Sequence, residues 1–344
     1  MAQYSFRDDY SEGAHPKIIE KLLQTNLLQE EGYGNDTFSD KAKKVIKSKL
    51  ENNHVDIHFV TGGTQANLTV LSSLLKPYES VIAVETAHIA LNETGAIEAT
   101  GHKIHSIKSY DGKLQCKEIQ EVLCDFNNEH HVKPRVVFIS NSTEIGSLYS
   151  KKELTDLSAF CKNNNLLLYM DGARLGSALT SKHNDLSFSD IIKLVDVFYI
   201  GGTKNGALLG EAVVIVNDNL KENFRFYMKQ RGALLPKGRL LGIQFLELFK
   251  DDLFFEIGRH ENEMATKLAN EIINLGFKFL TEPVSNQIFP ILHNNLIEKL
   301  SEKYSFHIWK KINENESAIR LVCSWATKVE FVDKFLNDLS NFVN

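Results

Sequence analysis

The sequence has few cysteines and no long apolar run. Its four cysteines form no CxxC pair and have no histidine at metal-ligand spacing, so neither a disulfide framework nor a zinc site is expected, and we assign no metal ligand. No apolar run approaches the roughly 20 residues that cross a bilayer, and the first residues lack the basic region and apolar stretch of a secretory signal. These absences predict a cytoplasmic protein with reduced thiols.

Blocks of one charge sign are also missing. The formal net charge of −5 is spread over interleaved Lys, Glu and Asp, which leaves no basic face for nucleic acid or an anionic membrane. A small-molecule partner is therefore favoured. With 43% hydrophobic residues among 344, the chain can bury a sizeable core and is long enough for one large domain and one smaller domain.

Short β-rich runs alternate with amphipathic stretches from about residue 55 to residue 216. Strands are expected at 57–60, 80–84, 103–107, 135–140, 166–170, 195–200 and 212–216, and amphipathic stretches at 68–75, 91–99 and 151–162. This alternation predicts an α/β fold with a mostly parallel central sheet flanked by helices. The runs at 166–170 and 195–200 are almost continuously apolar, as in strands that are covered on both faces.

The pattern changes after residue 216. Long charged amphipathic segments are found at 220–229, 240–249 and 257–275, and strand-like runs follow at 277–280, 287–292 and 319–322. A second, smaller α/β unit is therefore expected to begin near Gly276. We predict a large domain with an N-terminal arm over residues 1–250 and a small C-terminal α/β domain over residues 251–344.

One apolar run ends in a carboxylate. Residues 166–170 lead into Asp171, Gly172 and Arg174, and ligands gather at the carboxyl ends of strands in a parallel sheet. A carboxylate that leaves an apolar strand needs a cationic partner to stay charged. A protonated pyridine nitrogen, Arg174 or a metal could be that partner; in the other interpretation, Asp171 caps the following helix.

A second apolar run, at 195–200, leads through small residues to Lys204. Small neighbours leave room for a ring to approach the lysine. A lysine that is partly removed from water has a lowered pKa, which suits it to imine formation. Taken alone, the same pattern also describes a surface lysine after a strand.

A third segment, at 60–68, ends a strand in Thr61, Gly62, Gly63 and Thr64 and opens an amphipathic helix. Free backbone N–H groups and the helix dipole bind anions at such a position, and glycine lets the backbone approach a phosphate. The segment matches neither the dinucleotide-binding nor the nucleoside-triphosphate glycine pattern. It is therefore either a site for a phosphate monoester or an ordinary capped helix.

Together, the three segments bring a phosphate cradle, a carboxylate and an imine-forming lysine to one edge of one sheet. Pyridoxal 5′-phosphate (PLP) requires this combination, because its phosphate is anchored, its ring nitrogen must stay protonated and its aldehyde is held by a lysine. We therefore predict a PLP enzyme in which Lys204 holds the cofactor as a Schiff base and Asp171 pairs with the ring nitrogen.

The order and spacing of residues 61–68, 171–175 and 203–204 resemble the threonine aldolase and β-eliminating lyase family among the fold-type I PLP enzymes. The resemblance covers nearly the whole chain. It implies a PLP-dependent lyase of the low-specificity L-threonine aldolase type, which cleaves L-threonine, L-allo-threonine or a related β-hydroxy-α-amino acid to glycine and an aldehyde. It also implies a homodimer or homotetramer with shared active sites.

The resemblance assigns roles around the cofactor. Gly62, Gly63 and Thr64 would hold its phosphate. His88 would stack on the face of the pyridine ring, and Arg174 would lie near the phenolic oxygen of the cofactor.

The resemblance also assigns roles around the substrate. Arg320 would clamp the substrate carboxylate, which an arginine fork can hold by two hydrogen bonds. Asp8 lies where many relatives have a substrate-binding serine, and Tyr33 belongs to a segment that lines the entrance of the site. Arg231 and Arg239 resemble basic residues that reach the cofactor phosphate of a neighbouring subunit.

One residue departs from the pattern of the family. Many threonine aldolases have a histidine in the loop after the fifth strand-like run, where this chain has Glu144. The base that removes the β-hydroxyl proton is therefore either His88 or Glu144, directly or through a water. With Lys204, these two residues are the predicted catalytic groups.

Three other functions are weighed against the aldolase. A β-eliminating lyase acting on tyrosine, tryptophan or serine would break the bond from Cα to its proton instead. A non-catalytic PLP-binding protein is disfavoured because Lys204, Asp171, Arg174 and Arg320 are all present. A metal-dependent hydrolase using Asp171 with His88 would require a bound metal. Pocket shape decides the physiological substrate among hydroxy amino acids.

Overall fold

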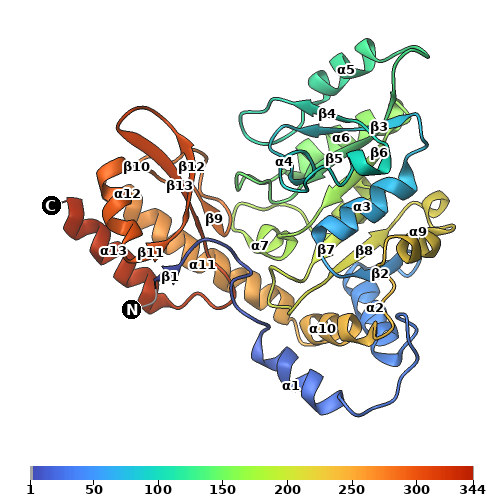
Figure 1. The fold of residues 1–344 in the computed structure, drawn as a ribbon, viewed down its shortest axis with the longest axis horizontal. Coiled ribbons are helices and arrows are strands. Elements are labelled where there is room, and N and C mark those ends of the chain that lie inside the picture. Colours follow the sequence, from blue (N-terminus) through green and yellow to red (C-terminus); the bar gives the residue numbers. More distant parts are fainter. Residues whose placement is uncertain (1–2, 344) are drawn as a thin grey trace.

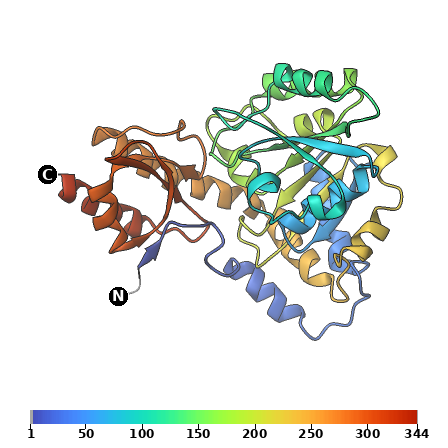
Figure 2. The same ribbon diagram turned by 45° about the horizontal axis from the view of Figure 1, so that its top comes forward.

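The computed structural model describes residues 3–343. Figure 1 shows a larger lobe around a seven-stranded sheet and a smaller lobe that carries the C-terminal elements. The N-terminal arm leaves the larger lobe and runs beside the smaller one, so the first and last described residues lie on the same side (Figures 1 and 2). The predicted α/β class is confirmed.

The central sheet has the order β2-β8-β7-β6-β5-β3-β4. Only β8 runs antiparallel to its neighbours β2 and β7, so the expectation of a mostly parallel sheet is confirmed. The apolar runs predicted to be covered on both faces are fully buried in β6 and β7. The strands are β2 (Asp56–Val60), β3 (Glu79–Val84), β4 (Ile104–Ile107), β5 (Lys133–Ser140), β6 (Leu167–Asp171), β7 (Val197–Gly201) and β8 (Glu211–Ile215).

Helices cover both faces of this sheet (Figure 1). Local signals decide where several of them begin: α6 starts at a capping box in which Ser150 and Glu153 satisfy each other's backbone N–H groups. The helices are α1 (Pro16–Thr25), α2 (Thr37–Lys49), α3 (Gly63–Leu74), α4 (His88–Leu91), α5 (Cys116–Asp125), α6 (Lys151–Asn163), α7 (Leu175–Thr180), α8 (Phe188–Leu194), α9 (Phe224–Gln230) and α10 (Arg239–Lys250), with 3₁₀ turns at Glu98–Thr100 and Asp218–Leu220.

The amphipathic stretch expected at 91–99 is not one helix. Helix α4 ends at Leu91, and only a 3₁₀ turn at Glu98–Thr100 follows. Thr94 (φ 52°) and Gly95 (φ 72°) adopt left-handed backbone conformations, which a right-handed helix cannot continue through. The break turns the Glu93 side chain into the core, where it meets His88.

The smaller lobe is built on a second, antiparallel sheet, in which β13 pairs with β10, β12 and β9. Strand β1 (Tyr4–Ser5) of the arm pairs in parallel with β11, and this pairing fastens the arm to the lobe. The elements are α11 (Leu253–Asn274), β9 (Gln287–Ile288), β10 (Ile291–His293), α12 (Asn294–Ser301), β11 (Tyr304–Ser305), β12 (His307–Lys311), β13 (Glu316–Val322) and α13 (Val329–Val343).

Two expectations for this lobe were wrong. The run at 277–280 forms only an isolated bridge between Phe279 and Pro290, and the run at 287–292 is split into β9 and β10. Pro290 lies at the split and has no N–H to extend either pairing. Strand β12 was not expected at all.

Helix α11 joins two hydrophobic cores. Its first turns, with Phe254 and Ile257, pack into the core of the larger lobe. Its later turns, with Leu268 and Ile272, pack into the core of the smaller lobe, which also takes Phe6 from the arm. The division into domains at residue 250 stays a prediction.

Gly258 lies where α11 crosses α7, and its lack of a side chain can be tested. A Cβ at this position would lie 2.5 Å from the carbonyl oxygen of Gly176 and 2.7 Å from Thr180 Oγ1. Because the two helices would have to separate, we expect Gly258→Ala to lower the free energy of unfolding by about 1–3 kcal/mol in urea denaturation. Gly13→Ala is the control, since a Cβ on Gly13 would meet no atom within 4 Å; equal losses in both variants would refute the close contact.

Candidate active site

A cleft of about 650 Å³ opens at the carboxyl edge of the central sheet. The loops that follow β2, β3, β5, β6 and β7 all contribute to its wall, as ligand sites of parallel sheets do. The smaller lobe and the arm close it from the other side. Among the residues that line it are Asp8, Gly62, Gly63, Thr64, His88, Glu144, Asp171, Arg174, Lys204 and Arg320, all of which the sequence had indicated.

Asp171 ends β6 as a carboxylate that is only 3% exposed. Its Oδ1 accepts hydrogen bonds from Tyr199 Oη at 2.5 Å and from the N–H of Ala173 at 3.0 Å, and its Oδ2 accepts one from Asn67 Nδ2 at 3.2 Å. These partners are all neutral. Asp171 is not the N-cap of α7, a position that Arg174 takes. Asp171 could therefore pair with a cationic group of a ligand.

His88, in the first turn of α4, faces the same cleft. Its Nδ1 lies 2.8 Å from Oε1 of the fully buried side chain of Glu93. This hydrogen bond, more than any other interaction, raises the pKa of His88 above its usual value. Glu93 Oε1 also accepts a hydrogen bond from Asn67 Nδ2 at 2.7 Å, so a buried chain of polar contacts connects His88 to Asp171.

The segment between β2 and α3 presents a helix N-terminus to the cleft. Its N-cap, Gly62, makes no side-chain cap hydrogen bond, and a Cβ on Gly62 would meet no atom within 4 Å. Gln65 Oε1 accepts from Thr61 N at 3.0 Å, and this bond holds the preceding turn in place. Uncapped N–H groups beside open space are what a phosphate requires.

Lys204 follows β7 and lines the same cleft. Its Nζ lies 5.9 Å from the centre of the Tyr10 ring, so the arm covers it. Nearby, Glu211 accepts a hydrogen bond from Gly202 N at 2.9 Å, and burial raises the pKa of Glu211 to about 7. The hydrogen bond between Glu211 and Gly202 thereby holds the turn that carries Lys204 in place.

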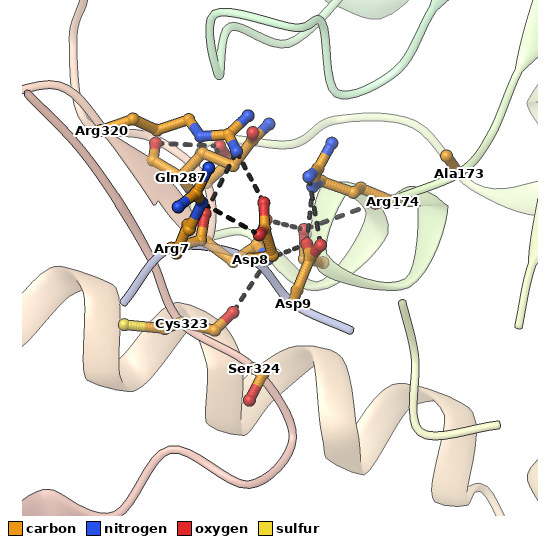
Figure 3. Close-up of polar contacts among 12 residues, drawn as sticks. Arg7, Asp8, Asp9, Ala173, Arg174, Gln287, Arg320, Cys323 and Ser324 are labelled. Carbon is orange, nitrogen blue, oxygen red and sulfur yellow. Dashed lines mark hydrogen bonds and ion pairs between the residues drawn. The ribbon is translucent and has the colours of Figure 1, made fainter. Parts of the chain in front are cut away.

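Arg174 is held by Asp9 of the arm, as Figure 3 shows. Arg174 Nε and Nη2 donate to the two carboxylate oxygens of Asp9 at 2.6 and 3.1 Å, and both side chains are almost fully buried. Asn286 Nδ2 donates a further bond to Asp9 at 3.1 Å. Burial opposes ionisation of Asp9, but the charges of Arg174 and Lys204 outweigh it, so the pKa of Asp9 lies below its usual value.

Arg320, on β13, reaches the cleft from the smaller lobe. Its Nη2 donates to Asp8 Oδ1 at 3.0 Å and to the backbone oxygen of Arg7 at 3.1 Å. Its guanidinium also lies over the ring of Trp309, 5.3 Å from the centroid. The structure thus brings two arginines, Arg174 and Arg320, to one side of the cleft.

Three predicted residues are not part of the cleft wall. Arg239 donates to the backbone oxygens of Thr25 and Leu28, which ties α10 to the end of α1. Tyr33 is 43% exposed. The backbone oxygen of Arg231 accepts a bond from Gln65 Nε2 at 3.3 Å. Their assigned roles toward a neighbouring subunit or the entrance of the site stay predictions.

Sequence reasoning missed several residues that hold these groups in place. Asn67, Glu93 and Glu211 are polar side chains at buried positions, and Tyr199 carries a hydroxyl inside an apolar strand. A buried tyrosine hydroxyl normally has a hydrogen-bond partner, so Tyr199 could have been singled out. Nothing local marks Asp9 as the partner of Arg174.

The fold and these groups define a PLP-dependent enzyme of fold type I. A solved aspartate aminotransferase of Thermus thermophilus has the same fold, with a TM-score of 0.73 at 12% identity over 99% of this chain and 92% of that one. The chain belongs to the beta-eliminating lyase family, whose sequence pattern matches residues 6–295. The predicted family and the predicted class of PLP-dependent lyase are confirmed.

Individual relatives cover almost the full length. The low specificity L-threonine aldolase of Pseudomonas aeruginosa is 33% identical over 339 residues, covering 96% of this chain and 95% of that protein. That of a Pseudomonas species is 34% identical, covering 98% and 97%. A solved threonine aldolase of Leishmania major superposes with a TM-score of 0.98 at 47% identity, covering 99% of this chain and 100% of that one.

Neither a spanning helix nor a metal cluster is found among residues 3–343. No helix in this range is both long and apolar enough to cross a bilayer. Within the same range, no group of three or more His, Cys, Asp or Glu side chains is arranged so that it could hold a metal ion.

The buried Asp9–Arg174 pair gives a testable stability prediction. In Asp9→Asn the charge of Arg174 stays buried without its counterion, so we expect a loss of about 3–5 kcal/mol in the free energy of unfolding, measured by urea denaturation near pH 7. The folded pKa of Asp9 lies below its unfolded value. Its stabilisation is therefore complete above about pH 4 and is lost as the pH falls through the folded pKa.

Asp252→Asn is the matched control for this prediction. Asp252 pairs with Lys49 at 2.8 Å, but the two side chains are 44% and 37% exposed. Exposed pairs contribute about 0–1 kcal/mol. A loss in Asp9→Asn no larger than that in Asp252→Asn would show that the buried pair is unimportant for folding.

Proposed function

We propose that the protein cleaves L-threonine, L-allo-threonine or a related β-hydroxy-α-amino acid to glycine and an aldehyde. The observation that carries this proposal is the cleft in which Lys204, the neutrally partnered Asp171, and two arginines face one another. The relatives named threonine aldolase, with near full-length coverage, support the choice of reaction.

The residues of the cleft fit PLP. When bound, PLP supplies an electron sink for the charge left on Cα after bond cleavage. Lys204 would hold its aldehyde carbon, Asp171 would keep its ring nitrogen protonated, and the open helix N-terminus at Gly62 would take its phosphate. Asp171 suits this role because it is buried and its hydrogen-bond donors among residues 3–343 are all neutral.

The remaining residues would orient the substrate and move its proton. Arg320 would bind the substrate carboxylate, and Arg174, immobilised by Asp9, would present its remaining Nη1 to the cleft. Neutral His88 would accept the proton of the β-hydroxyl group, and its hydrogen bond to Glu93 would stabilise the imidazolium that results. Glu144, only 8% exposed in the same wall, is the second candidate for this base.

β-Elimination is the second candidate reaction, because the matched family is described as beta-eliminating lyases. It would require a base at the Cα proton rather than at the β-hydroxyl. The two reactions differ in their products, which are glycine and an aldehyde in one case and a keto acid and ammonia in the other.

We further propose a cytoplasmic homodimer or homotetramer whose subunits complete each other's sites. The exposed ring of Tyr33 supports this, because aromatic side chains are enriched where subunits meet. So does Arg231, whose Nε is buried without a hydrogen-bond partner in the part of the chain that the structure describes. A second subunit could supply that partner.

The proposal predicts the behaviour of Lys204→Ala. The wild-type protein with PLP should show a visible absorption band that shifts on adding glycine or L-allo-threonine, and should release acetaldehyde and glycine. The variant should lose the covalent link to PLP and turnover together. Turnover that persists in Lys204→Ala, or pyruvate and ammonia as the only wild-type products, would overturn the assignment of the lysine or of the reaction, respectively.

The His88–Glu93 hydrogen bond predicts a shift in the pH profile. Because Glu93 raises the pKa of His88, Glu93→Gln should lower it. If neutral His88 is the base, the acid limb of the kcat/KM profile should move to lower pH. Glu98→Gln, at an exposed position of the following 3₁₀ turn, is the control. An acid limb that does not move would assign the base to Glu144.

A further inference from the structure

Asp8 already forms an ion pair with Arg320, the arginine that would bind the substrate carboxylate (Figure 3). Arg320 Nη2 donates one hydrogen bond to Asp8 Oδ1 at 3.0 Å and one to the backbone oxygen of Arg7 at 3.1 Å. A carboxylate can form two hydrogen bonds with a guanidinium group along either of two edges, Nη1–Nη2 or Nε–Nη2, and Nη2 belongs to both. A ligand carboxylate that binds Arg320 in this way must therefore displace Asp8 or the backbone oxygen of Arg7 from Nη2.

Nε, the other nitrogen of the Nε–Nη2 edge, is free to bond a ligand. Arg320 Nε is buried and has no hydrogen-bond partner among residues 3–343. A buried donor without a partner is costly. A ligand carboxylate that bonded Nε and Nη2 together would remove this cost, provided that the Asp8 side chain moved away.

Asp8 and Asp9 are neighbours in sequence but differ in how firmly they are held. Asp9 is fully buried and uses both oxygens in bonds to Arg174 and Asn286. Asp8 accepts one hydrogen bond from Arg320 at 3.0 Å, its other contact on Oδ1 is a longer one to His307 Nε2 at 3.4 Å, and its side chain is 16% exposed. Asp9 is therefore a fixed counterion, whereas Asp8 can be displaced at modest cost.

A second cation lies beside Asp8 and can compensate its charge when it leaves Arg320. Arg7 Nε lies 3.8 Å from Asp8 Oδ2 and donates a hydrogen bond to His307 Nε2 at 3.2 Å. Burial and the charges of Arg320 and Arg7 hold the pKa of His307 below its usual value, so the compensating charge is that of Arg7. A small rotation of the Asp8 side chain toward Arg7 keeps its charge compensated.

We propose that Asp8 is a displaceable internal carboxylate that occupies Arg320 until the substrate carboxylate replaces it. It acts as a specificity-determining residue, because only a ligand with a carboxylate of its own can make the exchange without leaving Arg320 uncompensated. Substrate affinity is lowered by the cost of this displacement. The inference rests on the proposed function in one respect, namely that Arg320 binds the carboxylate of an amino acid.

The test measures ligand binding to the PLP-loaded enzyme rather than turnover. Dissociation constants for glycine are obtained from the change in cofactor absorption. Asp8→Ser removes the competing carboxylate, and we expect it to bind glycine roughly two- to fivefold more tightly than wild type. Asp8→Asn is the isosteric second variant in case Asp8→Ser folds poorly. Asp8→Glu keeps the charge and should show no such gain.

Two controls separate displacement from a general change in charge. Glycinamide lacks the carboxylate, so its binding should not tighten in Asp8→Ser. Glu12→Gln removes an acid from the same arm that contacts Ser324 at 3.3 Å instead of Arg320, and it should leave glycine binding as it is. Equal tightening for glycinamide, or the same gain in Glu12→Gln, would overturn the proposal.

A double variant isolates the role of Arg320. In an Arg320→Ala background, Asp8→Ser should bring no further gain in glycine affinity, because no clamp remains to be freed. Weaker glycine binding in Asp8→Ser itself would overturn the proposal and make Asp8 a direct substrate ligand. Glycine binding does not depend on aldol cleavage, so an enzyme that forms no aldehyde would refute the proposed function while this test still decides the role of Asp8.

Discussion

The buried ion pair between Asp9 and Arg174 is the interaction on which the rest of the site depends. It joins the N-terminal arm to the turn after β6. Asn286 extends the connection to the smaller lobe, because its side chain donates a hydrogen bond to Asp9 and accepts one from Ser177 Oγ. A buried pair of this kind contributes little net stability over apolar packing, but breaking it is costly. It therefore acts chiefly to specify one arrangement of arm, sheet edge and smaller lobe.

The partners of Asp171 differ from those of Asp9. Asp9 takes two of the nitrogens of Arg174, whereas the carboxylate that ends β6 accepts from Tyr199, Asn67 and a backbone N–H, all of them neutral. Neutral donors keep a buried carboxylate solvated without cancelling its charge. In the function we propose, Asp171 would pair with the ring nitrogen of the cofactor. The same buried network continues through Asn67 and Glu93 to the imidazole of His88.

The fold alone does not decide the reaction. An aspartate aminotransferase shares the architecture at 12% identity, which fits the general observation that one fold carries many activities. The reaction depends on what faces the substrate, and we propose that here these groups are His88, Glu144 and the Asp8–Arg320 pair, all of which line the cleft. The acidic residue at position 144 and the ion pair that occupies Arg320 are features of this chain that a comparison of folds does not show.

The sequence by itself determined the class of fold, and it indicated the three segments that we propose as anchors of the cofactor. Apolar runs of strand length reveal β6 and β7, and the polar residues at their ends, Asp171 and Lys204, fall at the ligand-binding edge of any parallel sheet. These signals are local. The break after α4 was missed, because no apolar pattern marks the left-handed conformations at Thr94 and Gly95 that end the helix.

Only the tertiary structure decided which charges are shared, which are satisfied and which remain for a ligand. Asp9 and Arg174 are 165 residues apart, and Asp8 and Arg320 are 312 apart. No periodicity or neighbouring residue encodes such pairings, since they arise when the arm, the sheet edge and β13 meet. The chemistry of each residue is written in the sequence, but its protonation, orientation and availability follow from the partners that folding brings to it.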